Sequence, residues 1–74
     1  MRYFAIMHRG HGLKIRREAR LSDVWQREAA NNYGVKPLWV LAFPAARFDL
    51  VDMLRRTGWR GTLEAFRLEI TTID

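Results

Sequence analysis

Two histidines, His8 and His11, flank Arg9 near the start of the chain, and Lys14 and Arg16 follow closely. Imidazole groups can act as general acid and base at neutral pH, while Lys and Arg can hold a phosphate. If the fold brings His8, His11, Lys14 and Arg16 together, they would form the site of a small ribonuclease that needs no metal ion.

No metal or cofactor site is expected. The chain has no cysteine and only two histidines, which is too few for the three or four ligands of a usual zinc site. Neither Gly10 and Gly12 nor the GWRG segment at 58–61 has the sequence context of a phosphate-binding loop. Asp49 and Asp52 are interpreted as a helix cap and an ion-pair partner, so no pair of catalytic carboxylates is expected.

The length predicts one compact domain over residues 1–74, and a chain this short buries only about 60% of its unfolded surface. The hydrophobic share of 49% is too high for a disordered chain. The absence of cysteine excludes disulfides and favours a reducing, cytoplasmic location. No apolar run approaches the roughly 18 residues that span a bilayer, so no membrane partner is expected.

The charge is distributed unevenly. Residues 1–36 carry eight Lys and Arg against three Asp and Glu, whereas residues 37–74 carry five of each sign. The whole net charge of +5 therefore lies in the first half. Such a balance favours acidic surfaces or phosphates as partners, and it argues against a mimic of DNA, which must be acidic.

The first half of the chain begins like a β-hairpin. Residues 2–7 are apolar and aromatic, and the Gly10-His11-Gly12 turn follows. Residues 13–21 then alternate, which predicts a second strand with a basic face of Lys14, Arg16 and Arg20. The opposite face is apolar apart from Arg17.

Two helices and two further strands are expected after the hairpin. Ser22 as N-cap predicts a helix over 23–33 that buries Trp25, Ala29 and Tyr33 and stops at Gly34. The apolar segment 37–43 (PLWVLAF) predicts a central strand buried on both sides.

The second helix is expected to begin at the cap Asp49 and to stop at Gly58, with an Asp52–Arg56 ion pair and a core side of Leu50, Val51 and Leu54. The last segment, 62–73, alternates and predicts a strand that buries Phe66, Leu68 and Ile70. The expected fold class is therefore α/β (α+β) in the order ββαβαβ, with a mixed four-stranded sheet and both helices on one face.

A helix-turn-helix unit is the rival interpretation of the middle of the chain. Its spacing is matched by Ala30, Gly34, Val35 and Val40, which would make 37–43 the recognition helix. The side chains at 38–42 offer no donors for base edges, so the strand is preferred.

Two basic groups are the candidate partner contacts. The first surrounds the hairpin and consists of Arg9, Lys14, Arg16 and Arg20. The second follows the second helix and consists of Arg55, Arg56, Trp59 and Arg60. A tryptophan flanked by arginines has the composition of an interface hot spot.

Together these features predict a small non-enzymatic regulatory protein, an inhibitor or adaptor that binds and occludes a larger protein with an acidic surface. Compact proteins of this kind occur among phage-encoded inhibitors of host or defence machinery. A second copy of the chain is a further candidate partner. The alternatives are a nucleic-acid-binding protein that uses the basic hairpin, and the metal-independent ribonuclease toxin described above.

Overall fold

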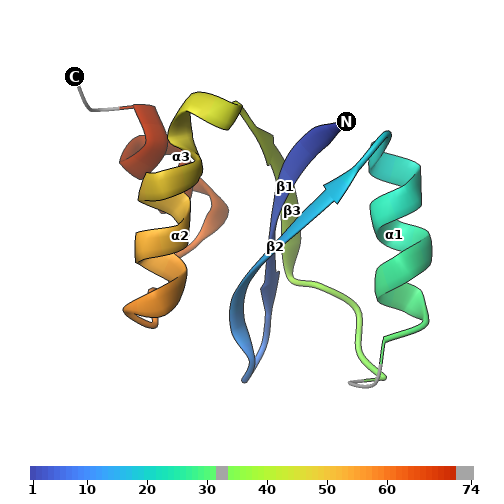
Figure 1. The fold of residues 1–74 in the computed structure, drawn as a ribbon. Coiled ribbons are helices and arrows are strands. Elements are labelled where there is room, and N and C mark those ends of the chain that lie inside the picture. The colour runs from blue at the N-terminus through green and yellow to red at the C-terminus, as the bar shows by residue number, and fades with distance from the viewer. Residues whose placement is uncertain (32–33, 72–74) are drawn as a thin grey trace.

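A computed structural model describes residues 1–31 and 34–71 and contains a three-stranded antiparallel sheet with strand order β2-β1-β3 (Figure 1). β1 (Arg2–His8) and β2 (Gly12–Glu18) form the predicted hairpin, and β3 (Trp39–Phe43) pairs with the other side of β1. β2 and β3 therefore run in the same direction on either side of β1.

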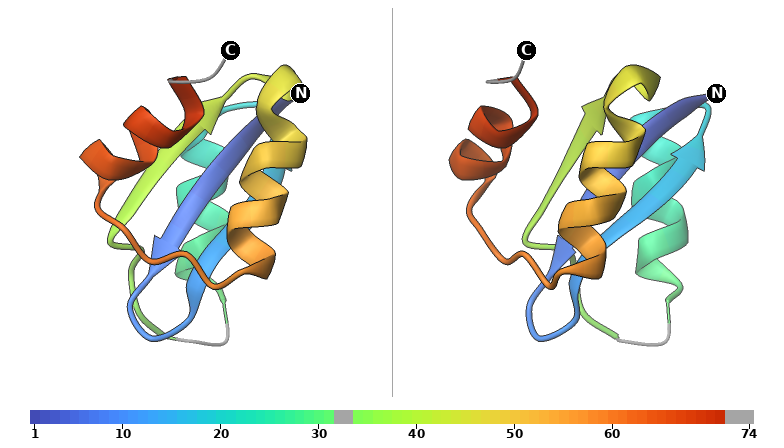
Figure 2. Two further views of the ribbon diagram at one scale, coloured as in Figure 1. Left: turned by 90° about the vertical axis from the view of Figure 1, so that its left-hand side faces the viewer. Right: turned by 60° about the vertical axis from the view of Figure 1, so that its left-hand side comes forward.

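Helices cover both faces of this sheet, as the views in Figures 1 and 2 show. α1 (Leu21–Ala29) lies on one face, and α2 (Phe48–Arg56) and α3 (Leu63–Thr71) lie on the other. The short 3-10 helix η1 (Ala45–Arg47) leads from β3 into α2. No helix within the described ranges is long and apolar enough to cross a membrane.

The central strand β1 is buried on both faces because its alternate residues supply two cores. Phe4 and Ile6 pack with Val24 beneath α1. On the other face the larger cluster contains Ala5, Met7, Leu13, Phe43, Val51, Leu54, Phe66 and Ile70. A strand that feeds two cores requires helices on both sides, so the expectation that both helices share one face was wrong.

The expected fourth strand is instead helix α3. The Thr62 hydroxyl accepts a hydrogen bond from the Ala65 amide at 3.1 Å, as a helix N-cap does. Phe66 and Ile70 lie one turn apart and are both buried, whereas Leu68 is 62% exposed. The sheet is therefore three-stranded and antiparallel instead of four-stranded and mixed, and residues 72 and 73 of the predicted strand lie outside the described residues.

The apolar segment 37–43 does form a strand, so the helix-turn-helix interpretation was wrong. The strand starts at Trp39. Both of its faces are covered, because Val40 and Ala42 pack on the α1 side while Trp39, Leu41 and Phe43 pack on the other. The predicted central position was wrong, since β3 is an edge strand of the sheet.

The first helix begins two residues earlier and ends four residues earlier than expected. β2 ends at Glu18, and α1 begins at Leu21 after the N-cap Arg20, which makes no side-chain cap bond, so Ser22 is not the cap. The helix ends at Ala29. Its core side is Val24 and Glu28, whereas Trp25 is 40% exposed. Tyr33, expected on the same face as Trp25, lies outside the described residues.

The second helix agrees better with its prediction. Val51 and Leu54 are buried, and Arg56 Nε lies 3.2 Å from the Asp52 carboxylate. Gly58 has a φ of +79° and stops the helix, because the next amide, that of Trp59, bonds back to the Leu54 carbonyl at 3.0 Å. Asp49 lies in the first turn but is not the cap, which is Arg47.

The register of α3 is testable by two substitutions in one segment. We expect Phe66→Ala to destabilise the protein by about 3–5 kcal/mol, because it opens a cavity in the larger core. Leu68→Ala should change stability by less than about 0.5 kcal/mol, because this side chain faces solvent. Urea unfolding measures both values, and equal losses at the two positions would instead indicate a strand that buries both.

Candidate functional site

A buried carboxylate, Glu28, forms the centre of the most polar part of the interior. Its side chain is fully buried, and the His8 side chain, also fully buried, places Nε2 at 2.7 Å from Glu28 Oε1. Lys14 Nζ lies 3.2 Å from both carboxylate oxygens. Arg16 and Asn31 approach at 3.4 Å and 3.1 Å. Four side chains from β1, β2 and the segment that follows α1 thus surround one carboxylate.

The strand periodicity explains how these residues meet. His8 follows Phe4 and Ile6 on the α1 side of β1, and Lys14 and Arg16 lie on the same side of β2. Glu28 lies one helical turn after Val24, so it faces the sheet where the apolar contact ends.

The environment of Glu28 keeps it ionised. Burial raises the pKa of this carboxyl, but hydrogen bonds from His8, Asn31 and Lys14, together with the charge of Lys14, outweigh burial and hold the pKa below its ordinary value of 4.5. An ionised carboxylate only accepts hydrogen bonds, so Nε2 of His8 carries the proton and donates.

The four residues of the ribonuclease hypothesis are only partly brought together. His8, Lys14 and Arg16 meet, but they meet around Glu28, and the imidazole of His8 is sealed from solvent. His11 is exposed, with its ring centroid 6.4 Å from that of His8. A base that is to act on RNA must reach its substrate, and His8 does not reach the surface in this arrangement.

The first predicted group of partner contacts is divided by the fold. Lys14 and Arg16 are partly buried beside Glu28, and Arg20 pairs with Asp23 at 3.3 Å. Arg9 lies exposed in the hairpin turn. The basic face therefore exists, but much of its charge is balanced within the chain.

The second group is divided as well. Arg55 and Arg56 both contact Asp52, at 2.8 Å and 3.2 Å. Arg60 is exposed. Trp59 is half-buried against the larger core and packs on Trp39 and Phe66, with centroid distances of 6.4 Å and 5.6 Å, so it contributes to the core.

The outer side of β2 is an open edge of the sheet. In Figure 1 this strand lies in front of the other two, between α1 and α2, with no other segment in front of it. Within the described chain, Ile15, Arg16 and Arg17 make no backbone hydrogen bonds beyond the ladder with β1. Alternate backbone groups of an edge strand point away from the sheet, ready to pair with another chain.

Cations border this strand on both sides, and we name the group Lys14, Arg16, Arg17, Arg27 and Arg55 the β2 basic edge. Arg27 comes from α1 and lies 3.6 Å from Glu18. Arg55 comes from α2. Arg17 is exposed and places its guanidinium 5.7 Å from the ring centroid of Tyr3, with no carboxylate partner among the described residues.

A hollow of about 470 Å³ runs between β2 and α2. Its lining combines apolar and charged side chains: Tyr3, Lys14, Ile15, Arg17, Phe48, Asp52 and Arg55. It therefore continues the β2 basic edge into a partly apolar groove.

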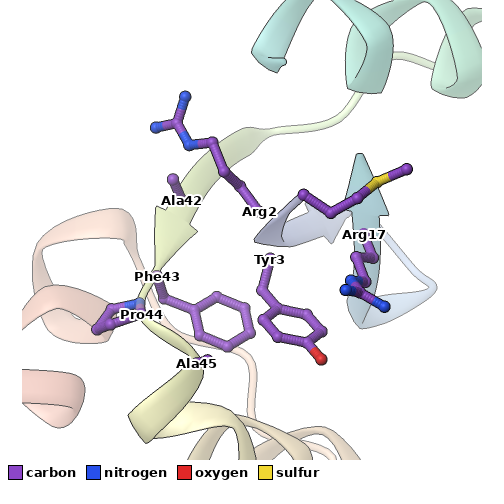
Figure 3. A pocket seen from close by; sticks show the side chains of 8 residues that line it. Arg2, Tyr3, Arg17, Ala42, Phe43, Pro44 and Ala45 are labelled. Carbon is purple, nitrogen blue, oxygen red and sulfur yellow. The ribbon is translucent and has the colours of Figure 1, made fainter. Parts of the chain in front are cut away.

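A second hollow, of about 530 Å³, lies at the start of β1 (Figure 3). Arg2 and Arg17 both line it, but their guanidinium groups point away from one another. The reason is the register: Tyr3 and Arg17 are paired on one face, so the neighbouring Arg2 belongs to the other. The two cations therefore do not form a common anion site.

Sequence reasoning missed Glu28, the residue that organises the cluster. The available signal was its spacing of four from Val24, which places a carboxylate on the core side of a helix that faces a basic strand. It also missed Arg17, Arg27 and the open edge, because strand order is not visible in the sequence.

No group of three or more His, Asp or Glu side chains within 1–31 and 34–71 is placed to hold a metal ion. Comparisons of the chain with protein-family models, with curated proteins and with solved structures give no match.

The lowered pKa of Glu28 predicts how stability depends on pH. The folded pKa lies below 4.5, so the native protein binds fewer protons than the unfolded chain does. The stabilisation from Glu28 is therefore fully present above pH 4.5 and is lost as the pH falls through the folded pKa.

Glu28→Gln should remove this contribution and cost about 1–3 kcal/mol at neutral pH, because the donors around the carboxylate lose their charged acceptor. Urea unfolding should show that the deficit shrinks as the pH falls below 4.5. The matched control is Glu69→Gln, at an exposed carboxylate on α3. A deficit that does not depend on pH, or an equal one in the control, would contradict this account of Glu28.

Proposed function

We propose that this protein is a small non-enzymatic regulatory protein, an inhibitor or adaptor that binds and occludes a larger protein with an acidic surface. The observation that carries the proposal is the β2 basic edge. It combines an open side of the sheet with cations from β2, α1 and α2, so one surface offers backbone groups and positive charge together. Such complementarity steers an acidic partner and fixes its orientation.

Two features favour a protein partner over nucleic acid. Tyr3, the aromatic side chain beside Arg17, is already stacked on Phe43 at 5.8 Å and packs on Phe48 at 5.1 Å, so its ring serves the core. Proteins that bind single-stranded nucleic acid stack its bases on such aromatic rings. Glu28 also balances part of the charge of Lys14 and Arg16, which weakens attraction for phosphates.

The burial of His8 supports the non-enzymatic part of the proposal. A ribonuclease would need this imidazole at the surface, whereas it is sealed beneath α1 by its bond to Glu28. We propose a cytoplasmic location as well, for which the absence of cysteine is the support.

A homodimer is the second candidate, and a separate surface favours it. Leu38 is 56% exposed. Trp25 is also exposed, and with Pro37 it lines a mainly apolar hollow of about 380 Å³. A second copy would cover apolar area there. Sedimentation tests this candidate, because a Leu38→Ser variant would then dissociate at concentrations where the natural chain is dimeric.

The proposed function predicts a position-specific effect of charge. We expect the double variant Arg17→Glu and Arg27→Glu to fold normally, since both side chains are exposed. Its affinity for fluorescent poly-L-glutamate should fall at least about tenfold, because two attractive contacts become repulsive. Fluorescence anisotropy measures this, with labelled single-stranded RNA, single-stranded DNA and duplex DNA as parallel probes at low and physiological salt.

The control compares single charge reversals, so that the change of net charge is the same. Arg67 is exposed on α3, which packs against β3 at the far edge of the sheet, so Arg67→Glu should leave most of the affinity, whereas Arg17→Glu alone should lower it. Equal losses in the two single variants would indicate attraction by net charge only. Binding of RNA or DNA that survives physiological salt and exceeds binding of poly-L-glutamate would replace the proposal by nucleic-acid binding.

A further inference from the structure

The open side of β2 offers more than charge. β2 has seven residues and pairs with β1 along its whole length, so its outer side presents a regular row of backbone donors and acceptors. In Figure 1 β2 lies between α1 and α2, which stand on the two faces of the sheet. On the α2 side, the hollow lined by Ile15, Arg17 and Phe48 borders this strand.

We infer that the outer side of β2 takes up an extended acidic segment of the partner as a fourth strand, paired with the backbone of β2. The inference rests on the proposed function, because it names the part of the acidic partner that the β2 basic edge binds. Addition of a strand to an open edge supplies main-chain hydrogen bonds for affinity, and side-chain contacts on the two faces for specificity.

The side chains on the two faces beside β2 specify the chemistry of the added strand. On the α1 side it would meet Lys14, Arg16 and Arg27, so acidic side chains fit there. On the α2 side it would meet the groove that contains Ile15 and Phe48, with Arg17 and Arg55 at its border. Successive residues of a strand point to opposite faces, so the segment alternates between acidic and apolar residues.

Charge decides between this occupant and a second copy of the chain. If β2 paired with β2 of another copy about Arg16 or Arg17, that arginine would lie opposite its own counterpart, and like charges directly opposite each other repel. An acidic segment would place opposite charges at these positions. The cations that admit an acidic strand therefore disfavour self-pairing in these registers.

The test uses a fluorescent eight-residue peptide of alternating Glu and Val, acetylated and amidated at its ends. A peptide with the same eight residues, four Glu followed by four Val, is the control for composition. Two further versions of the alternating peptide carry N-methyl groups, one on every Glu nitrogen and the other on every Val nitrogen. In a paired strand only one of these sets of N–H groups points at β2.

We expect the alternating peptide to bind more tightly than the blocked peptide. One N-methylated version should lose at least about tenfold in affinity and the other should lose much less, because only one set of amides donates to β2. In the alternating peptide, acidic residues face α1, so Arg27→Glu should weaken binding and Arg67→Glu should not.

Equal binding of both N-methylated versions, with binding still weakened by Arg27→Glu, would overturn strand addition while leaving the proposed function in place. No binding of any acidic peptide or of poly-L-glutamate at low salt would end both, and the cations would then serve only to protect an edge strand from pairing. Preference for a single-stranded oligonucleotide over all the peptides would also overturn the inference.

Discussion

The buried carboxylate of Glu28 is the constraint on which the arrangement of the first half of the chain depends. α1 buries only Val24 and Glu28, so its attachment to the sheet is half apolar and half electrostatic. An isolated charge in this position would be costly, and it is stable only because donors from both hairpin strands surround it. The contact therefore connects α1 to β1 and β2 at once and fixes where the helix lies.

This arrangement also shapes the surface. Lys14 and Arg16 point toward Glu28, which leaves Arg17, Arg27 and Arg55 as the exposed cations of the β2 basic edge. Glu28 thus balances part of the charge of Lys14 and Arg16, while the exposed cations of the β2 basic edge stay at the surface. A surface of moderate positive charge beside an open strand suits an acidic polypeptide better than the dense charge of a nucleic-acid backbone.

Much of the fold could be predicted from local patterns. The hairpin, the strand within 37–43 and the second helix follow from turn residues, alternation and the Gly58 stop, which act within a few residues. The fourth strand was wrong because positions 66 and 70 fit both an alternating strand and one face of a helix, and the Thr62 cap decides between them.

The candidate site was less predictable, for a physical reason. Its residues come from β1, β2 and α1, and their meeting depends on which face of the sheet each helix covers. Lys14 and Arg16 were singled out from the sequence, but Glu28 was assigned no role, because a charged residue on a helix is usually solvated. The open edge of β2 follows from strand order, which arises from long-range packing.

If the outer side of β2 is the binding surface, a bound partner should protect the backbone amides of β2 from hydrogen exchange. Exchange is followed by NMR with and without saturating poly-L-glutamate at low salt. The account predicts that alternate amides between Leu13 and Glu18 exchange more slowly in the complex, while those of α3 do not change. Protection along β3 or α3 in place of β2 would contradict it.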